Sequence, residues 1–182
     1  MMKIGFLYKG CEGQTRKIMD KLSGFLMDQG YQVQLFSIDE LPRDFSLEAL
    51  DAYVLGCSVR YGKHHKPFVD FVKQYADQLN RKPSFFFSVN LTARKANRNK
   101  PYTNQYLCNF LRTQKWQPDH VAVFAGALFY RRYTMINRLM IQLIMKMTGG
   151  STDINKDIEY TDWQKVETFA GEIASHLISS NK

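Results

Sequence analysis

The sequence predicts a single α/β domain in which a five-stranded parallel sheet, of strand order 2-1-3-4-5, lies between two layers of helices. Apolar runs of strand length alternate with amphipathic helical segments along the chain. The 182 residues are 45% hydrophobic and 23% charged, as in an ordinary globular domain. Glycine-containing loops follow the first and third runs, whose carboxyl ends meet at the ligand-binding edge of such a sheet.

The strands are expected at five apolar runs: Ile4 to Tyr8, Tyr31 to Phe36, Ala52 to Cys57, Pro83 to Val89 and His120 to Ala125. The segments between them carry apolar residues at helical spacing. Gly30 ends the first helix, Pro67 opens the second, and Thr103 to Thr113 forms another. Thr161 and Gln164 predict a capping box at the start of the last helix.

The loop "YKGCEGQT", Tyr8 to Thr15, joins the first strand to the first helix. It contains neither the nucleotide-triphosphate motif nor the dinucleotide fingerprint. Backbone N–H groups at such a turn, together with the helix dipole, favour a phosphate, although an ordinary strand-to-helix turn fits equally well. The topology predicts that the loop "SVRYGKHH", Ser58 to His65, lies beside it.

Positive charge is concentrated in one half of a chain whose net charge is +8. Residues 78 to 152 hold twelve basic side chains and one acidic side chain, Asp119. This asymmetry favours an anionic partner, which could be a nucleic acid, a phospholipid surface or an acidic small molecule, over a merely solvated surface. Three widely spaced cysteines and no visible secretory signal predict reduced thiols in the cytosol and no metal site.

An insertion at about residues 127 to 152 precedes the last helix, where a short connection is expected. Within it, Thr134 to Met147 predicts a helix that is shorter than the ~20 residues needed to span a membrane. Two interpretations remain open. The helix could lie in a bilayer interface with Arg131, Arg132, Arg138 and Lys146 near lipid phosphates, or it could pack on the domain or across a ligand site. Its apolar face comprises Met135, Ile136, Leu139, Met140, Leu143, Ile144 and Met147.

Motifs along nearly the whole chain resemble the flavodoxin-like fold and, more closely, the quinone-dependent protoporphyrinogen dehydrogenases of bacterial haem synthesis. These motifs are "GQTR", "SVRYGKHH", "FFSVNLTARK", "AGALFYRRY", "MIQLIMKMTGG" and "YTDW". The resemblance implies a flavodoxin-like three-layer sandwich that binds FMN. It also implies the six-electron oxidation of protoporphyrinogen IX to protoporphyrin IX, with menaquinone or ubiquinone as the electron acceptor.

The resemblance places the FMN phosphate in the first loop, at Lys9, Gly10, Cys11, Glu12, Gly13, Gln14 and Thr15. There we expect Lys9 to supply charge and Glu12 to point outward, because a carboxylate facing the phosphate would be unfavourable. The flavin ring is flanked by Ser58, Val59, Arg60, Tyr61, Gly62, Ser88, Val89, Asn90 and Leu91. Tyr61 is the candidate for stacking on the ring.

Charge and placement suggest that Arg94, Lys95, Arg131 and Arg132 bind the two propionates of the porphyrinogen. His64 and His65 are candidates for proton transfer because histidine titrates near neutral pH, although a solvated pair is an equal alternative. The expected location is cytoplasmic, with peripheral attachment to an anionic inner membrane. Association with further copies of the chain is left open.

Two other classes of protein compete with the enzyme. A flavodoxin-type electron carrier without an organic substrate shares the fold, but such carriers are usually acidic and do not need the insertion. A nucleic-acid-binding module would suit the positive charge, but the sequence contains no recognised motif of that class.

Overall fold

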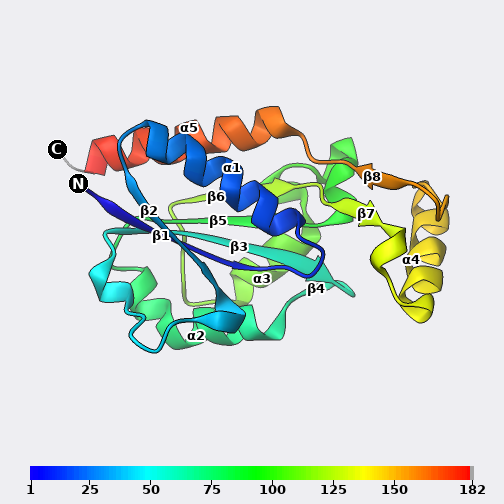
Figure 1. Ribbon diagram of the computed structural model, residues 1–182, viewed down its shortest axis with the longest axis horizontal. Helices are drawn as coiled ribbons and strands as arrows, with labels where there is room; N and C mark the ends of the chain where they lie inside the picture. The colour runs from blue at the N-terminus through cyan, green and yellow to red at the C-terminus, as the bar shows by residue number, and fades with distance from the viewer. Residues whose placement is uncertain (181–182) are drawn as a thin grey trace.

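The computed structural model describes residues 1–180, except for the side chains of Arg132 and Thr148. Its central sheet contains five parallel strands in the order β2-β1-β3-β5-β6, which confirms the predicted arrangement (Figure 1). The strands are β1 (Lys3–Lys9), β2 (Gln32–Ser37), β3 (Ala52–Arg60), β5 (Ser84–Val89) and β6 (His120–Phe124). All five predicted runs therefore form strands.

Helices cover both faces of the sheet, as the alternating pattern predicts (Figure 1). One layer consists of α1 (Gln14–Asp28) and α5 (Trp163–Ser180), and the other of α2 (Lys66–Leu79) and α3 (Gln105–Thr113). Consecutive phenylalanines of β5 show how one strand serves both layers. Phe85 and Phe87 pack toward α1 and α5, whereas Phe86 packs toward α2 and α3, because neighbouring side chains of a strand point to opposite faces.

The segment Ser58 to His65 differs from the predicted loop. Ser58–Arg60 continue β3, and β4 (Lys63–His64) turns back to pair with them in an antiparallel hairpin. Tyr61 and Gly62 form the turn with φ angles of 51° and 79°, as a two-residue type I′ turn requires. The hairpin places Arg60 and Tyr61 beyond the carboxyl end of the sheet.

The insertion forms a small unit of its own at that end of the sheet (Figure 1). β7 (Ala127–Phe129) pairs with β8 (Asp157–Glu159) in an antiparallel ribbon, so the inserted segment extends past the expected residue 152. Between these strands lies α4 (Met135–Thr148). The unit packs around a separate cluster of buried side chains, formed by Leu128, Tyr130, Tyr133 and Met145.

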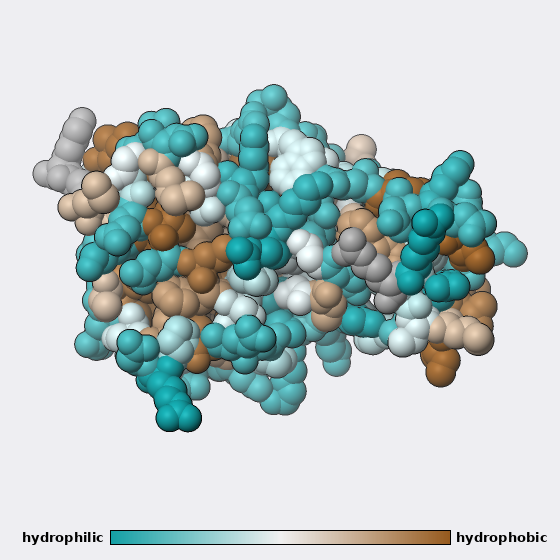
Figure 2. Space-filling model, in the orientation of Figure 1, coloured by the Kyte–Doolittle hydropathy of each residue, from teal (hydrophilic) through white to brown (hydrophobic). Residues whose placement is uncertain are grey.

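Two polar side chains of α4, Arg138 and Gln142, turn toward the chain segments that flank the helix, and the apolar face lies in solvent. Arg138 Nε donates a hydrogen bond to the Tyr130 carbonyl (3.1 Å), and Gln142 Nε2 donates one to the Thr152 carbonyl (3.0 Å). All seven apolar side chains of the predicted face are exposed. Figure 2 shows hydrophobic side chains at the end of the molecule where α4 lies. Within residues 1–180, none of the helices is both long enough and apolar enough to cross a bilayer.

The predicted capping box at Thr161 is wrong. Asp162 caps α5 instead, since its Oδ1 accepts a hydrogen bond from the Lys165 N–H (3.3 Å). Thr161 is buried, and its hydroxyl donates to the Ala125 carbonyl (2.7 Å) while accepting from Gln14 Nε2 (2.8 Å). One hydroxyl thereby joins the start of α1, the end of β6 and the segment leading to α5.

We predict that Thr161→Val lowers the free energy of unfolding by about 1–3 kcal/mol, because the buried Gln14 amide and Ala125 carbonyl lose their partner. Urea titration measures the change. Thr161→Ser, which keeps the hydroxyl, is the control and should retain most of the stability. Equal losses in the two variants would show that the methyl group matters more than the hydrogen bonds.

Candidate functional site

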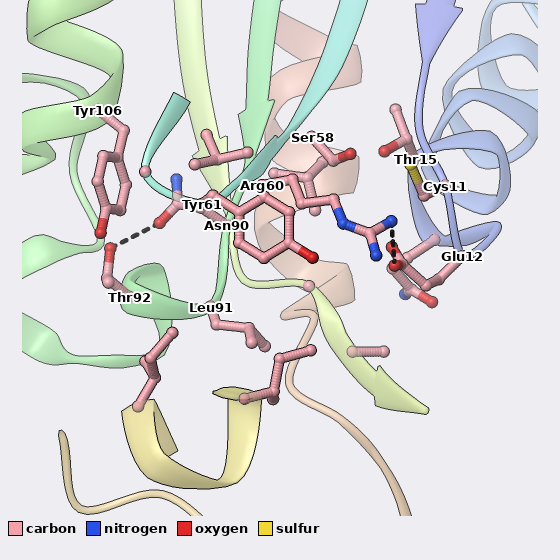
Figure 3. Close-up of a pocket in the computed structure, with 18 of the residues that line it drawn as sticks. Cys11, Glu12, Thr15, Ser58, Arg60, Tyr61, Asn90, Leu91, Thr92 and Tyr106 are labelled. Carbon is pink, nitrogen blue, oxygen red and sulfur yellow. Dashed lines mark hydrogen bonds and ion pairs between the residues drawn. The ribbon is translucent and has the colours of Figure 1, made fainter. Parts of the chain in front are cut away.

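A cavity of about 210 Å³ lies where the carboxyl ends of the central strands meet α4 (Figure 3). Its walls come from the first loop, the β3–β4 hairpin, the segment after β5 and the insertion. The lining residues are Cys11, Glu12, Gln14, Thr15, Ser58, Val59, Arg60, Tyr61, Gly62, Val89, Asn90, Leu91, Thr92, Tyr106, Gly126, Ala127, Tyr133, Ile141 and Ile144. The two loops that the topology predicted to be neighbours thus share one cavity.

The first loop has the features of an anion site at the start of α1. Gly13 occupies the N-cap with φ 91°, and the first turn of α1 contains no acidic residue. Thr15 is buried in that turn and lines the cavity. A Cβ atom on Gly10 would come within 2.7 Å of Thr15 Oγ1, so the loop needs glycine there to pass this close to the hydroxyl.

Charged residues near the first loop are arranged differently from the expectation. Lys9 forms an ion pair with Asp39 and does not line the cavity in the described part of the chain, so its charge is already compensated. Glu12 lines the cavity, and the prediction that it points outward is wrong. Its carboxylate lies 3.5 Å from Arg60 Nη1. This ion pair offsets the repulsion between Glu12 and an anion bound to the loop.

Tyr61 links the hairpin to α4. Its hydroxyl donates a hydrogen bond to Asn137 Oδ1 (2.5 Å), and its ring centroid lies 5.3 Å from the guanidinium carbon of Arg60. The ring stands at the cavity (Figure 3), and it is half exposed. A stacking surface for a planar ligand is therefore present, anchored at one end by the insertion.

The segment after β5 is held rigidly by Asn90. Its Oδ1 accepts hydrogen bonds from Thr92 Oγ1 (2.7 Å) and from the Ala93 N–H (3.1 Å). Asn90 is buried, and with Val89 and Leu91 it forms one wall of the cavity. Ser88, the remaining predicted residue of this segment, is buried and contacts His64 instead.

The two histidines have different surroundings. His64 is buried beside the rings of Phe86 and Phe110, with Nε2 2.8 Å from Ser88 Oγ, and burial lowers its pKa to about 4. His65 is half-buried, and its Nε2 lies 3.1 Å from Ser58 Oγ and 3.6 Å from Cys11 Sγ. Burial, with help from Lys9 and Arg60, lowers its pKa as well. The ring of His65 thus contacts two residues of the cavity wall, Ser58 and Cys11.

Three of the four cations chosen for the substrate carboxylates lie outside the cavity lining: Arg94, Lys95 and Arg131. Arg94 Nη1 donates a hydrogen bond to the carbonyl of Leu91 (2.7 Å), a residue of the cavity wall. Arg131 Nη2 donates to the Asn155 carbonyl (3.0 Å), and Lys95 is partly exposed. The side chain of Arg132 lies outside the described residues. Among described residues, the cavity contains a single cation, Arg60.

Several lining residues were missed in the sequence. Thr92 and Tyr106 approach from the segment after β5 and from α3, and Tyr133, Ile141 and Ile144 come from the insertion. Ile141 does not belong to the predicted apolar face of α4, so that face alone could not identify Ile141 as a lining residue. No cluster of three or more His, Cys, Asp or Glu side chains suited to a metal occurs in the part of the chain that the structure describes.

Comparisons with known proteins agree with this geometry. Residues 6–155 match the family model described as a flavodoxin domain. A protein of Escherichia coli strain K12 named "Protoporphyrinogen IX dehydrogenase [quinone]" is 46% identical over 97% of this chain and 96% of its own length. A Leishmania major protein of the same name is 44% identical over 93% of this chain and 73% of its own. Oxidised Flavodoxin 1 from Bacillus cereus shares the fold at 14% identity, with a TM-score of 0.53 over 96% of this chain and 98% of the flavodoxin.

We predict that acid destabilises the protein through His64. Its folded pKa of about 4 lies below the ordinary value of 6.5, so the folded state binds fewer protons than the unfolded state between these values. The free energy of unfolding is therefore unaffected by His64 above pH 6.5 and falls by up to about 3 kcal/mol as the pH drops toward 4. Urea titrations from pH 7.5 to 4.5 should show a shallower decline in His64→Gln. Identical slopes in both proteins would contradict the assignment.

Proposed function

The chain belongs to the flavodoxin-domain family, and we propose that it is an FMN-dependent dehydrogenase that oxidises protoporphyrinogen IX to protoporphyrin IX in haem biosynthesis. A respiratory quinone accepts the electrons. The conversion removes six electrons from each substrate molecule, which amounts to three two-electron rounds.

One observation carries the proposal: the relationship to proteins named "Protoporphyrinogen IX dehydrogenase [quinone]" extends over 97% of the chain at 46% identity. That coverage includes the insertion, which supplies the cavity walls formed by Tyr133, Ile141 and Ile144. A carrier without an organic substrate has no need of an inserted apolar wall to hold one. The insertion therefore favours the enzyme over the flavodoxin-type carrier.

The residues at the cavity fit FMN. Gly10 to Thr15 would hold the phosphate, because the first turn of α1 offers backbone N–H groups, a threonine hydroxyl and no acidic side chain. Ser58 to Gly62 and the segment Val89 to Leu91 would flank the ring, and these residues line one continuous cavity. When bound, FMN supplies the capacity to accept a hydride equivalent from the porphyrinogen and to deliver electrons to a quinone.

The chain itself contributes binding, orientation and proton handling. Ile141 and Ile144 of α4 form an apolar wall that suits the macrocycle and excludes water from it. Asn90, held by its own network, keeps the opposite wall in place. Burial lowers the pKa of His65 and so favours the neutral imidazole, the form that can accept a proton beside the cavity wall.

We also propose that the enzyme is cytoplasmic and lies on the inner membrane surface through α4. The exposed apolar face of this helix suits the boundary between headgroups and acyl chains, and the basic side chains of residues 78 to 152 suit anionic lipids. Such a position would give a lipid-held quinone access to a cavity that borders α4. Turnover rates measured with menaquinone and with ubiquinone distinguish the two as electron acceptors.

We predict that the purified protein is yellow and forms fluorescent protoporphyrin anaerobically from protoporphyrinogen only when a quinone is added. Gly13→Val should weaken FMN binding about tenfold or more, because a β-branched residue is strained at φ 91°. Flavin fluorescence titration measures the dissociation constant. Gly24→Val is the matched control, since Gly24 has a helical conformation with open space around it in α1. Equal affinities in the two variants would count against a phosphate site at Gly13.

We predict that anionic phospholipid vesicles bind the protein and that binding declines as salt is raised. Replacing Leu139 and Leu143 together by Asp should abolish vesicle binding without lowering the free energy of unfolding, because these side chains are 62% and 59% exposed. Ile178→Asp is the control, since Ile178 is 56% exposed on α5. Sedimentation with the vesicles measures the bound fraction. Retention of binding by the double variant, or equal binding to neutral vesicles, would overturn the proposed contact.

A further inference from the structure

A second cavity, of about 240 Å³, adjoins the first at the entrance to α4. It is lined by Cys11, Glu12, Arg60, Tyr133, Thr134 and Asn137. Cys11, Glu12, Arg60 and Tyr133 also line the first cavity, so the two hollows share a wall. Figure 3 shows the pair of Arg60 and Glu12 at this shared wall.

The two hollows differ in chemistry. The first has apolar walls from Val59, Val89, Leu91 and the two isoleucines of α4, whereas the second is surrounded by hydroxyl, amide and charged groups. A substrate whose ring lies against the two isoleucines of α4 and whose arm enters the second cavity must therefore be amphipathic, with a broad apolar body and a polar arm. The arm would meet Arg60, the single cation that lines either hollow among the described residues.

We propose that Arg60 binds a carboxylate of the porphyrinogen in the second cavity and so determines specificity for the acidic form of the substrate. This inference rests on the proposed function, because that function supplies a ring with carboxylate arms. It replaces the expected role of Arg94, Lys95 and Arg131, none of which lines either cavity.

The geometry of Arg60 suits this task. Its contact with Glu12 is 3.5 Å long, compared with the 2.7–2.9 Å typical of a charge-assisted hydrogen bond, and a guanidinium has five N–H donors. Tyr61 and Cys11 also accept side-chain hydrogen bonds from Arg60, so together with Glu12 they orient the group, and these three contacts do not use all five donors. The position is fixed by the strand, because Arg60 is the last residue of β3 and pairs with Lys63 of β4.

The first turn of α4 adds neutral donors. Asn137 Oδ1 accepts from the Tyr61 hydroxyl, so the group that Asn137 can present to a ligand is its Nδ2 amide. Thr134 contributes a hydroxyl at the start of the same helix, where the dipole favours negative charge. A carboxylate held by Arg60 would thus be met by donors from the insertion as well.

Steady-state kinetics with two substrates tests the inference. Protoporphyrinogen carries free carboxylates, and its dimethyl ester lacks their charge while keeping the ring. In Arg60→Gln we expect KM for the diacid to rise about tenfold or more, with kcat changed by less than about twofold, while the ester is affected little. Arg60→Lys should restore part of the diacid affinity, because it restores the charge without the planar fork.

Controls separate this role from others. Arg112→Gln removes an exposed cation of α3 and should change neither constant. Because Arg60 also borders the proposed flavin site, the FMN dissociation constant of Arg60→Gln is measured by flavin fluorescence, and all kinetic constants are taken at saturating FMN. If it rises, and saturating FMN restores the diacid KM, the anion held by Arg60 is the cofactor phosphate and the inference is wrong.

The remaining outcomes also decide the matter. A KM that stays constant in Arg60→Gln, or that rises equally for diacid and ester, would overturn the inference while leaving the proposed function intact. A diacid-specific loss in Arg131→Gln but not in Arg60→Gln would return the role to the insertion. If the unaltered protein oxidises neither substrate, the proposed function fails and the inference fails with it.

Discussion

Parallel pairing of β1 with β3 is the constraint on which the site depends. The register sets Tyr8 opposite Gly56 and Lys9 opposite Cys57, so two loops whose starts are about fifty residues apart in the sequence leave the sheet side by side. Backbone groups at the end of a parallel sheet have no further strand to pair with, and the first turn of α1 adds unpaired N–H groups. Where the side chains of these two loops are small, their backbone groups can therefore contact a ligand. The hairpin and the insertion surround this end of the sheet and enclose the site.

The sheet and its order could be predicted from the sequence because buried parallel strands are continuous apolar runs, and α/β alternation restricts the topology. Hydrogen bonds of individual polar side chains were harder to predict from the sequence. Thr161 and Gln164 have the spacing of a capping box, but a stronger partner for the threonine hydroxyl lies at Ala125, 36 residues away, which no local pattern reports. The loop after β3 was similarly misjudged, because Tyr61 is an unusual residue at a positive φ and hides the type I′ turn.

The orientation of α4 shows what helical periodicity leaves undetermined. A period of 3.6 identifies an apolar face but does not say that the face packs inward. Here Arg138 and Gln142 turn inward, because their side chains donate hydrogen bonds to carbonyl groups of the flanking segments. Met145 and, in part, Ile141 anchor the helix by apolar contact. An exposed row of large apolar side chains is rare on a monomeric soluble protein, and it commonly marks a surface that meets lipid or a partner.

Charge acts on two length scales in this molecule. The excess of basic residues between 78 and 152 generates a field that extends about 10 Å into solution at ordinary salt, which is enough to favour anionic surfaces but not to select one ligand atom. To select one ligand, the protein needs a hydrogen-bond donor inside a cavity of low dielectric constant. Counting charges along the sequence could not identify that donor. It pointed to Arg94 and Arg131, which instead donate to backbone carbonyls. Arg60 was placed beside the flavin ring for its position after β3 and not for its charge. Arg60 lies at the end of a strand, and Glu12 and Tyr61 hold its side chain in place. It therefore loses less side-chain entropy on binding a ligand than a flexible surface cation would.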